Sequence, residues 1–363
     1  MKTLASLVFF LLLTTSVQAA PPFYRVTDLG TLGKVAGISV ADGINNRGQI
    51  VCHYSLDKGD TPQLPFLWEN GKLKRLHLPP QIYDNGPRPW SINNRGELAG
   101  TVAGNEFDQR ACLITGGHLQ LLKRLGEGFS INKGEAYGIN DSGQIVGYTA
   151  IKQDPHFVTD PIPHAVLWQN GVVHDLGTLG GPTSVAFAIN GTGDVVGVSD
   201  APHGKNYVFL YHAGKLVPLS SPPEKADFSP IGMNGLDQIV GTSDAKSVDK
   251  FGQGRDVPVL WSGKVLTNLC HGNKKYKYGT ANAINFEGQI VGSVNDGEAD
   301  EDGGYANHAE LWKDGSGYDL NKCVQPTAGW MLSEAISINS HGWIVGTGIH
   351  NGHTRAFLLT PVK

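Results

Sequence analysis

One short phrase recurs along this chain and limits the folds that are open to it. The copy at residues 136–149 reads AYGINDSGQIVGYT, and six other segments resemble it closely. The central asparagines of the copies lie 44 to 54 residues apart, a spacing typical of repeat architectures in which each copy forms one packed unit. These asparagines are Asn45, Asn93, Asn140, Asn190, Asn234, Asn285 and Asn339.

Each copy predicts two antiparallel strands joined by a tight turn. Asn140 can cap its own turn, Gly143 can adopt positive φ, and a β-rich run follows from Gln144. A second phrase, such as AVLWQNGVVHDLGTL from Ala165, follows most copies and predicts two more short strands. Four strands per repeat fit the blades of a β-propeller, and the seven blades would start near residues 41, 89, 136, 186, 230, 281 and 335.

The two ends of the repeat array complement each other. The seventh copy stops at AFLLTPVK, after its third expected strand, whereas YRVTDLGTLG from Tyr24 matches the fourth-strand phrase VHDLGTLG from Val173. We therefore predict an all-β fold, a seven-bladed β-propeller of four-stranded antiparallel blades over residues 20–363. A strand at residues 23–30 would pair with the last blade and hide its edge. An open β-solenoid is the alternative, and it leaves the complementary ends unexplained.

Several phrases resemble a known repeat family. DLGTLGG at residues 175–181, HAVLW from His164, HAELW from His308 and the IN-x-x-G-QIVG pattern are similar to the HAF repeats of bacterial extracellular proteins. The resemblance covers nearly all of residues 20–363, and it implies secreted repeat proteins, mostly without an assigned activity. The second copy, with ELAG and ACLITGG, and the fifth, with Asp237 at the expected turn glycine, depart most from the pattern.

The first residues are typical of a secretory signal peptide. Lys2 precedes the apolar run at residues 4–13, and Val17-Gln18-Ala19 forms a small-residue cleavage pattern, so residues 1–19 are expected to be removed. No later stretch approaches the roughly 20 apolar residues of a membrane span. We expect a secreted or periplasmic monomer without membrane insertion. Without Lys2, 28 basic and 33 acidic side chains remain, which argues against a nucleic-acid partner.

The connections between expected strands suggest where ligands bind. The first-to-second and third-to-fourth connections are short and stereotyped, whereas the other two vary and emerge at the same end of an up-and-down blade. Variable loops on a rigid scaffold commonly carry binding, so this face is expected to take a protein or carbohydrate ligand. The binding candidates there are Trp90, Tyr207, Lys274, Lys275, Tyr276 and Trp330. For each of them an ordinary exposed or core role is the alternative.

Two further groups of residues are candidate sites. The third expected strands begin with His164, His308, Arg110 and Arg355 in four of the copies, which could hold an anion or a sugar, or serve as weak catalytic candidates. The plain alternative is that these side chains meet solvent at strand ends. Carboxylates alternate at Asp296, Glu298, Asp300 and Asp302, a pattern that attracts calcium, although a bidentate carboxylate at the twelfth position is missing. Calcium is the one cofactor considered, and a solvated acidic loop is its alternative.

The function expected from the sequence is a secreted, non-enzymatic binding scaffold. The chain has no HExxH, no G-x-S-x-G and no phosphate-binding loop, which lowers the odds of an enzyme without excluding one. One alternative is a hydrolase or lyase with a site at the mouth of the central channel. Another is a calcium-stabilised structural protein of the envelope. The thiols of Cys52, Cys112, Cys270 and Cys323 could pair as disulfides or stay free and buried.

Overall fold

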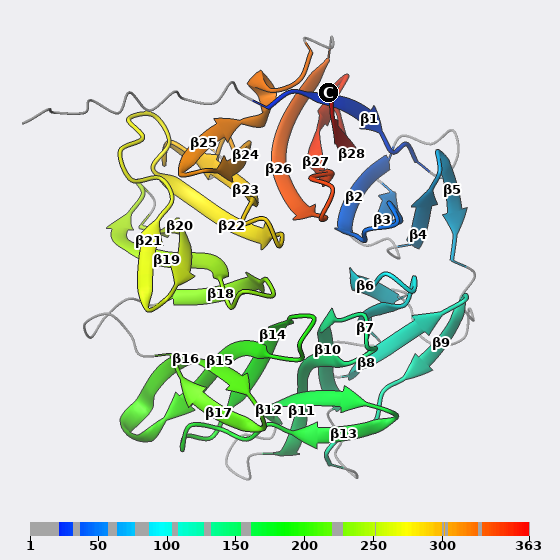
Figure 1. Cartoon of the computed structure of the whole chain (residues 1–363), viewed down its shortest axis with the longest axis vertical. Coiled ribbons are helices and arrows are strands. Elements are labelled where there is room, and N and C mark those ends of the chain that lie inside the picture. Colours follow the sequence, from blue (N-terminus) through cyan, green and yellow to red (C-terminus); the bar gives the residue numbers. More distant parts are fainter. Residues whose placement is uncertain are drawn as a thin grey trace, which may run out of the picture.

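The structure, a computed structural model, consists of antiparallel β-sheets around a common centre (Figure 1). It describes residues 22–31, 37–56, 64–76, 87–103, 108–126, 132–153, 161–219, 228–250, 252–299, 301, 304–325 and 329–362. The predicted signal peptide at residues 1–19 lies outside these ranges. Within them the chain is all-β, with two short 3-10 turns, η1 (Pro202–Gly204) and η2 (Leu320–Lys322), and no helix that is long and apolar enough to cross a membrane.

Each repeat copy begins a four-stranded unit, and the units are numbered here in chain order. The first unit contains β2 (Gly37–Ile44), β3 (Ile50–Leu56), β4 (Leu64–Glu69) and β5 (Lys72–Arg75). The second contains β6 (Pro87–Ile92), β7 (Leu98–Ala103), β8 (Asp108–Thr115) and β9 (His118–Leu121). The third contains β10 (Asn132–Ile139), β11 (Ile145–Gln153), β12 (Pro161–Gln169) and β13 (Val172–Asp175). The fourth contains β14 (Ser184–Ile189), β15 (Val195–Ala201), β16 (Lys205–His212) and β17 (Lys215–Pro218).

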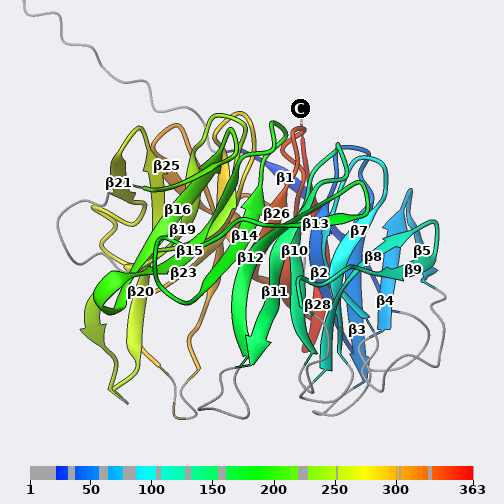
Figure 2. The same cartoon turned by 90° about the horizontal axis from the view of Figure 1, so that it is seen from below.

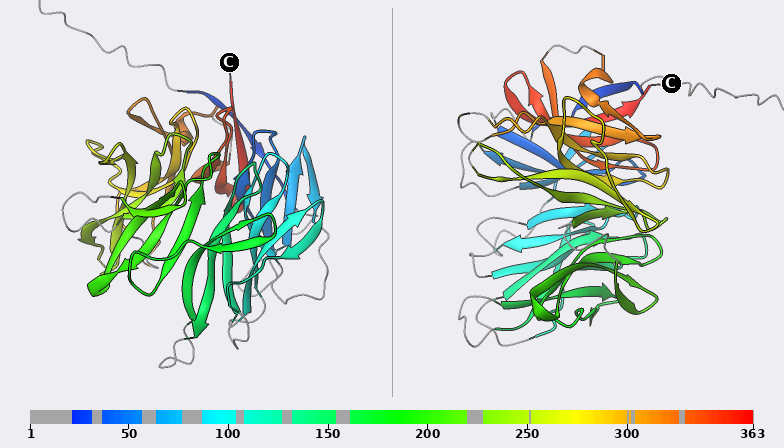
Figure 3. Two further views of the ribbon diagram at one scale, coloured as in Figure 1. Left: turned by 60° about the horizontal axis from the view of Figure 1, so that its bottom comes forward. Right: turned by 90° about the vertical axis from the view of Figure 1, so that its left-hand side faces the viewer.

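The remaining units follow the same order of strands. The fifth contains β18 (Phe228–Met233), β19 (Ile239–Val248), β20 (Gly254–Ser262) and β21 (Val265–Asn268). The sixth contains β22 (Tyr278–Ile284), β23 (Ile290–Asn295), β24 (His308–Lys313) and β25 (Ser316–Asp319). The seventh contains β26 (Trp330–Ile338), β27 (Ile344–His350) and β28 (His353–Pro361), and its fourth strand is β1 (Tyr24–Asp28) from the other end of the chain. Figures 1 and 3 show β1 beside the carboxy-terminal strand.

The strands of the described residues form five four-stranded sheets and one eight-stranded sheet. The first strand of each unit lies near the centre and the fourth at the periphery, and the strands run between the two faces of the molecule (Figures 1 and 2). The larger sheet arises because β10 pairs in parallel with β8 over Asn132 and Lys133, which joins the second and third units. The sequence predicted separate blades at this point, and that detail is wrong.

The repeated asparagine explains why the turn sequence recurs. The Oδ1 atom of Asn234 accepts the backbone N–H groups of Leu236 and Gln238 at 3.0 and 3.1 Å. Its Nδ2 donates to Oε1 of Gln238 at 2.7 Å and to the carbonyl oxygen of Asn285 in the next unit at 3.0 Å. One buried side chain thus shapes its own turn and ties two units together.

The same bond between neighbouring units recurs along the whole array. Each central asparagine donates to the carbonyl oxygen of the next, at distances from 2.9 to 3.5 Å. The last of them, Asn339, donates to the carbonyl oxygen of Asn45 at 3.1 Å. The first and seventh units are therefore tied in the same way as units that are adjacent in sequence.

Asn234→Ala is expected to lower the free energy of unfolding by about 2 kcal/mol, because it leaves buried backbone donors without acceptors. Urea denaturation of the wild type and the variant measures this loss. Asn206→Ala is the control, since Asn206 is an exposed residue of β16, and it should change stability by less than about 0.5 kcal/mol. Equal effects of the two substitutions would show that the asparagine bonds contribute little.

A β-bulge interrupts the first strand of every unit. The pairing between first and second strands shifts at one shared position, where the extra residues are Asp42, Trp90, Tyr137, Phe187, Ile231, Asn282 and Ile336. The seventh unit has a second shift, at Ser333. Trp90 and Tyr137 approach each other with ring centroids 6.3 Å apart, and Tyr137 and Phe187 stack at 5.6 Å. The bulged aromatic side chains of the second, third and fourth units therefore contact one another. Bulges commonly re-aim side chains near functional sites.

Tryptophans that recur at one strand position fill the space between units. Trp168 of the third unit is 4% exposed and packs with Ala99 and Ala111 of the second. Its Nε1 donates to the carbonyl oxygen of Lys123 at 2.6 Å. Trp261 and Trp312 are buried against the preceding unit in the same manner. All four cysteines, Cys52, Cys112, Cys270 and Cys323, are free and buried, so the disulfide alternative does not apply to this structure.

Candidate active site at the channel mouth

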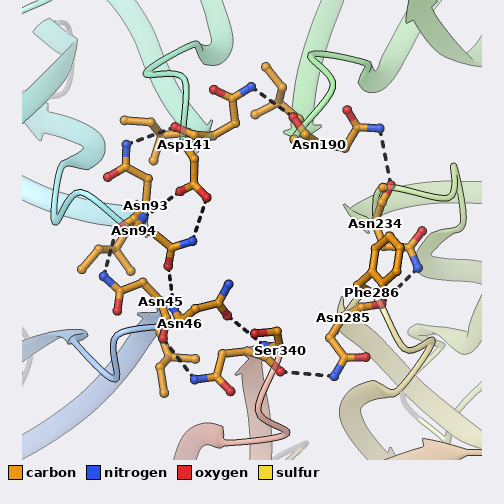
Figure 4. A pocket seen from close by; sticks show the side chains of 18 of the residues that line it. Asn45, Asn46, Asn93, Asn94, Asp141, Asn190, Asn234, Asn285, Phe286 and Ser340 are labelled. Carbon is orange, nitrogen blue, oxygen red and sulfur yellow. Dashed lines mark hydrogen bonds between the residues drawn. The ribbon is translucent and has the colours of Figure 1, made fainter.

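A cavity of about 320 Å³ lies where the seven asparagine turns converge. It is lined by the repeated Ile-Asn pairs at the ends of the inner strands and by the residue after each asparagine (Figure 4). The asparagine side chains are used in the bonds described above, so the variable residues that follow them decide the chemistry of this opening. These rim residues are Asn46, Asn94, Asp141, Gly191, Gly235, Phe286 and Ser340.

Half of the rim is closed by hydrogen bonds. The backbone N–H of Ser340 donates to Oδ1 of Asn46 at 2.9 Å, and that of Asn46 donates to Oδ1 of Asn94 at 2.7 Å. The N–H of Asn94 donates to Oδ1 of Asp141 at 2.8 Å. In each case a side-chain oxygen of the next unit accepts the N–H of the preceding rim residue (Figure 4).

The N–H groups of Asp141, Gly191 and Gly235 have no such acceptors, because Gly191, Gly235 and Phe286 carry no side-chain oxygen. The next residue after Phe286 on the rim is Ser340, whose hydroxyl accepts no bond from the Phe286 N–H in the described part of the chain. Within the described residues, the N–H groups of Asp141, Gly191, Gly235 and Phe286 donate no hydrogen bond. The turns repeat, so these four N–H groups face the same rim as their bonded equivalents. Backbone N–H groups that converge on one opening suit an anion or a polarised carbonyl oxygen.

Asp141 supplies the one carboxylate among the described residues that line this cavity. Its side chain is exposed, and its second oxygen accepts Nδ2 of Asn94 at 2.7 Å. Two bonds from one neighbour hold the carboxylate at the junction between the closed and the open half of the rim. One opening thus contains both a hydrogen-bonded carboxylate and free donors, an arrangement that can activate water toward a carbonyl group.

A buried Asp–His pair lies at the bulge level of the first unit. Nδ1 of His53 lies 2.8 Å from Oδ2 of Asp42, and the two side chains are only 8% and 6% exposed. Burial raises the pKa of the Asp42 carboxyl, while the His53 hydrogen bond opposes the rise. Because both side chains are shielded from solvent, we interpret the pair as a structural contact and not as a catalytic group that a substrate could reach.

The predicted catalytic residues do not line the channel-mouth cavity or come together. His164 lies 2.9 Å from Asp175 of its own unit, and His308 lies 3.8 Å from Asp319. Asp175 also accepts the N–H of Gly177 at 2.8 Å, so the histidine and the turn share one aspartate. Arg355 donates to the carbonyl oxygen of Gly37. Nε of Arg110 is buried without a hydrogen-bond partner in the described part of the chain.

The predicted binding residues are also dispersed. Nε1 of Trp90 donates to Oγ1 of Thr101 at 3.2 Å, and the Arg88 guanidinium lies 4.0 Å from the Trp90 ring centre. Trp330 stacks on His350 with ring centroids 4.4 Å apart. Of the remaining candidates, Tyr207 is partly buried, and Lys274 and Lys275 are exposed. The Tyr276 ring is buried, and its centroid lies 4.8 Å from the centroid of the His308 ring and 4.6 Å from Nζ of Lys275.

The predicted calcium loop is only partly described. Asp296 and Glu298 are exposed, and Oδ1 of Asp296 accepts the N–H of Glu298 at 2.9 Å. Asp300 and Asp302 lie outside the described residues. Within the described ranges, no group of three or more histidine, cysteine, aspartate or glutamate side chains is placed to hold a metal ion. Calcium at this loop stays a prediction.

Solved structures with a similar fold are β-propellers, while no protein-family model and no curated sequence matches the chain. The propeller domain of the trilobed protease of Pyrococcus furiosus, described as having an open velcro topology, aligns with a TM-score of 0.54 at 9% identity, over 90% of this chain and 94% of that one. A puromycin-hydrolysing peptidase of Mycobacterium tuberculosis gives 0.53 at 14% identity, over 93% and 56%. A prolyl endopeptidase structure gives 0.53 at 11% identity, over 94% and 51%.

These neighbours bear both on the fold and on the expected function. At such identities the likeness establishes a β-propeller fold, and the chain spans about half the length of the latter two enzymes. All three propellers belong to proteases or peptidases, which contradicts the expectation of a non-enzymatic binding scaffold. That expectation rested on missing local motifs, and a site assembled from several repeats needs no local motif.

Proposed function

We propose that the protein is a hydrolase that takes an amide substrate of peptide type at the mouth of its central channel. The observation that carries this proposal is that the Asp141 carboxylate lines the same cavity as the unbonded N–H groups of Gly191, Gly235 and Phe286. A carbonyl oxygen that gains negative charge during attack would be stabilised by these donors. The peptidase propellers among the solved structures support the choice of an amide bond.

The nucleophile in this proposal is water. Within the described residues no serine or cysteine side chain hydrogen-bonds to a histidine, so a covalent serine or cysteine route has no support. Asp141 accepts a proton from water as the water oxygen bonds to the carbonyl carbon. The carbon–nitrogen bond then breaks, and the proton passes from Asp141 to the leaving nitrogen. The N–H groups of Gly191 and Gly235 hold the carbonyl oxygen throughout.

We further propose that the seven units form a closed seven-bladed ring in a secreted or periplasmic protein related to the HAF repeats. The bond from Asn339 to Asn45 and the pairing of β1 with β28 support closure. A repeated His–Asp contact would explain why the HAF-type phrases contain both residues, because His164 and His308 each contact the aspartate eleven positions later. The apolar segment at residues 4–13 supports export.

Asp141→Asn is expected to lower kcat for a cleaved amide substrate by a factor of about 100 to 10,000, the range for loss of a general base. Cleavage of a pooled fluorogenic peptide library identifies a substrate, and single-peptide kinetics then give kcat and KM. The KM should change little, because the backbone donors remain in place.

The matched control is Asp314→Asn, which makes the same charge change at an exposed turn of the sixth unit that does not line the cavity. It should leave the kinetics unchanged, and thermal unfolding should show both variants to be folded. Absence of cleavage by the wild type across ester and amide substrates, or equal losses in the two variants, would rule the proposal out.

A further inference from the structure

A second, larger cavity of about 560 Å³ lies between the first and second units. Its walls come from β4 and β5 of the first unit, from β7 to β9 of the second, and from the asparagine turns of both. It shares no lining residue with the channel mouth. We propose that this inter-unit pocket binds a small organic anion that carries a flat apolar group, such as an aryl carboxylate.

The apolar space exists because the second unit lacks the tryptophan that four other units carry at the junction with the preceding unit. Trp68, Trp168, Trp261 and Trp312 each pair with the isoleucine that opens the second strand of their unit. The equivalent register position in the second unit is Ile114, which pairs with Leu98. In those four units the indole fills the space against the preceding unit, as Trp168 does. Tyr211 and Leu359 take the equivalent position in the fourth and seventh units. At this junction a much smaller side chain is followed by Gly116 and Gly117, which leaves room for a planar ring.

The floor of the pocket is apolar. Ile114 is 2% exposed and belongs to one core cluster with Val51 and Leu98, against which Leu67 and Leu76 pack. Four of these five residues, Leu67, Leu76, Leu98 and Ile114, line the pocket. A ligand ring that enters this space would gain burial at roughly 25 cal/mol per Å² of apolar area.

The rim of the pocket is cationic. Arg47, Lys74, Arg75 and Arg95 line it, and the lining carboxylate, Glu69, accepts Nε2 of Gln49 at 2.8 Å. Arg95 pairs with Glu97 at 2.6 Å, and Arg47 makes one long contact, 3.5 Å, to the carbonyl oxygen of Asn94. Lys74 and Arg75 are exposed, and neither forms an ion pair within the described residues.

Charge and shape together define the ligand class. The whole chain carries a formal net charge of −4, so a rim with four basic side chains is a local feature and not a consequence of composition. An arginine fork can bind a carboxylate through two parallel hydrogen bonds. A free inorganic anion would leave the apolar floor unused, whereas a neutral ring would leave the cations unpaired. A ligand that joins both parts fits both surfaces.

Isothermal titration calorimetry with indole-3-acetate tests the site, with indole and acetate as the two half-ligands. We expect saturable binding of indole-3-acetate and at least tenfold weaker binding of either half-ligand. The inference does not rest on the hydrolase proposal, and the titration requires no turnover. Equal binding of indole and indole-3-acetate, or no binding of indole-3-acetate, would overturn it.

Two variants locate the binding. Ile114→Trp introduces the indole that four other units carry at this position, and it should abolish binding while raising the melting temperature. Arg75→Gln should weaken binding of indole-3-acetate about fivefold or more without changing the fold. Lys215→Gln, an exposed lysine on β17 of the fourth unit, is the control and should bind as the wild type does. If Ile114→Trp folds poorly, Arg75→Gln still decides the matter, because unchanged binding in that variant would contradict the site.

Discussion

Gly292→Ala is expected to lower the free energy of unfolding by about 4 kcal/mol or more, as backbone overlap in a packed interior does. A β-carbon at Gly292 would overlap the carbonyl oxygen of Thr280 and lie 3.0 Å from Cα of Ala281. Both atoms belong to the backbone of the adjacent strand β22, where the bulge at Asn282 brings the chain close. No side-chain rotation can relieve this contact. The second-strand glycines of five other units meet the same obstacle.

Gly254→Ala is the matched control, because no atom lies within 4 Å of the added β-carbon and its φ is not in the left-handed region. It should change stability by less than about 1 kcal/mol in either direction. Urea denaturation of the two variants beside the wild type gives the comparison. A loss below about 1 kcal/mol for Gly292→Ala would show that the bulge is not what requires glycine at this position.

Glu310→Gln is expected to stabilise the protein at alkaline pH and to have little effect near pH 4.5. Glu310 is 3% exposed, and its Oε2 has no hydrogen-bond partner within the described residues. Burial raises the pKa of this carboxyl to about 8, the charge of Asp319 adds to the rise, and Lys322 opposes it. A glutamate in the unfolded chain titrates near pH 4.3.

The sign of the pH effect follows from these two values. Between about pH 4.5 and 8 the unfolded chain has released the proton, whereas the folded chain still holds it. Stability therefore falls as pH rises through this window, by roughly 1.4 kcal/mol per pH unit at most. The advantage of Glu310→Gln over the wild type should reach on the order of 3 to 5 kcal/mol at pH 8.5.

Urea denaturation at pH 4.5 and 8.5 measures the two differences, and other titrating groups cancel because they are common to both proteins. Glu287→Gln, at an exposed turn position, should show no such pH-dependent gain. A gain from Glu310→Gln that is the same at both pH values would mean that Glu310 is ionised in the folded state throughout.

The strands and turns could be predicted because their signals are local. An asparagine with a glycine three residues later sets six of the seven hairpins, and the Tyr24 phrase identified the strand that pairs with β28. The parallel pairing of Asn132 and Lys133 with Asp108 and Gln109 of β8 depends on how the starts of two strands from different units come together in space. No short pattern in the sequence encodes that meeting, so the eight-stranded sheet could not be foreseen.

The candidate site was harder to predict, because it lies on the short repeated turns and not on the longer variable connections. The stereotyped turns were set aside as structural, yet the residue after each asparagine changes from Asn46 to Asp141 to Gly191 and sets the chemistry of the rim. That variable position was the available signal. His164 and His308 attracted attention as a pair, whereas the equal spacing to Asp175 and Asp319 indicated a contact within each unit.

The most direct test of the channel-mouth site is a backbone-amide NMR titration with a phosphonate dipeptide, a tetrahedral anion that resembles the intermediate of amide hydrolysis. The account predicts saturable shifts of the four unbonded rim amides, with smaller shifts at the bonded amides of Asn46, Asn94 and Ser340. The four are Asp141, Gly191, Gly235 and Phe286. Absence of shifts at these amides, or shifts confined to the pocket around Arg75, would contradict it.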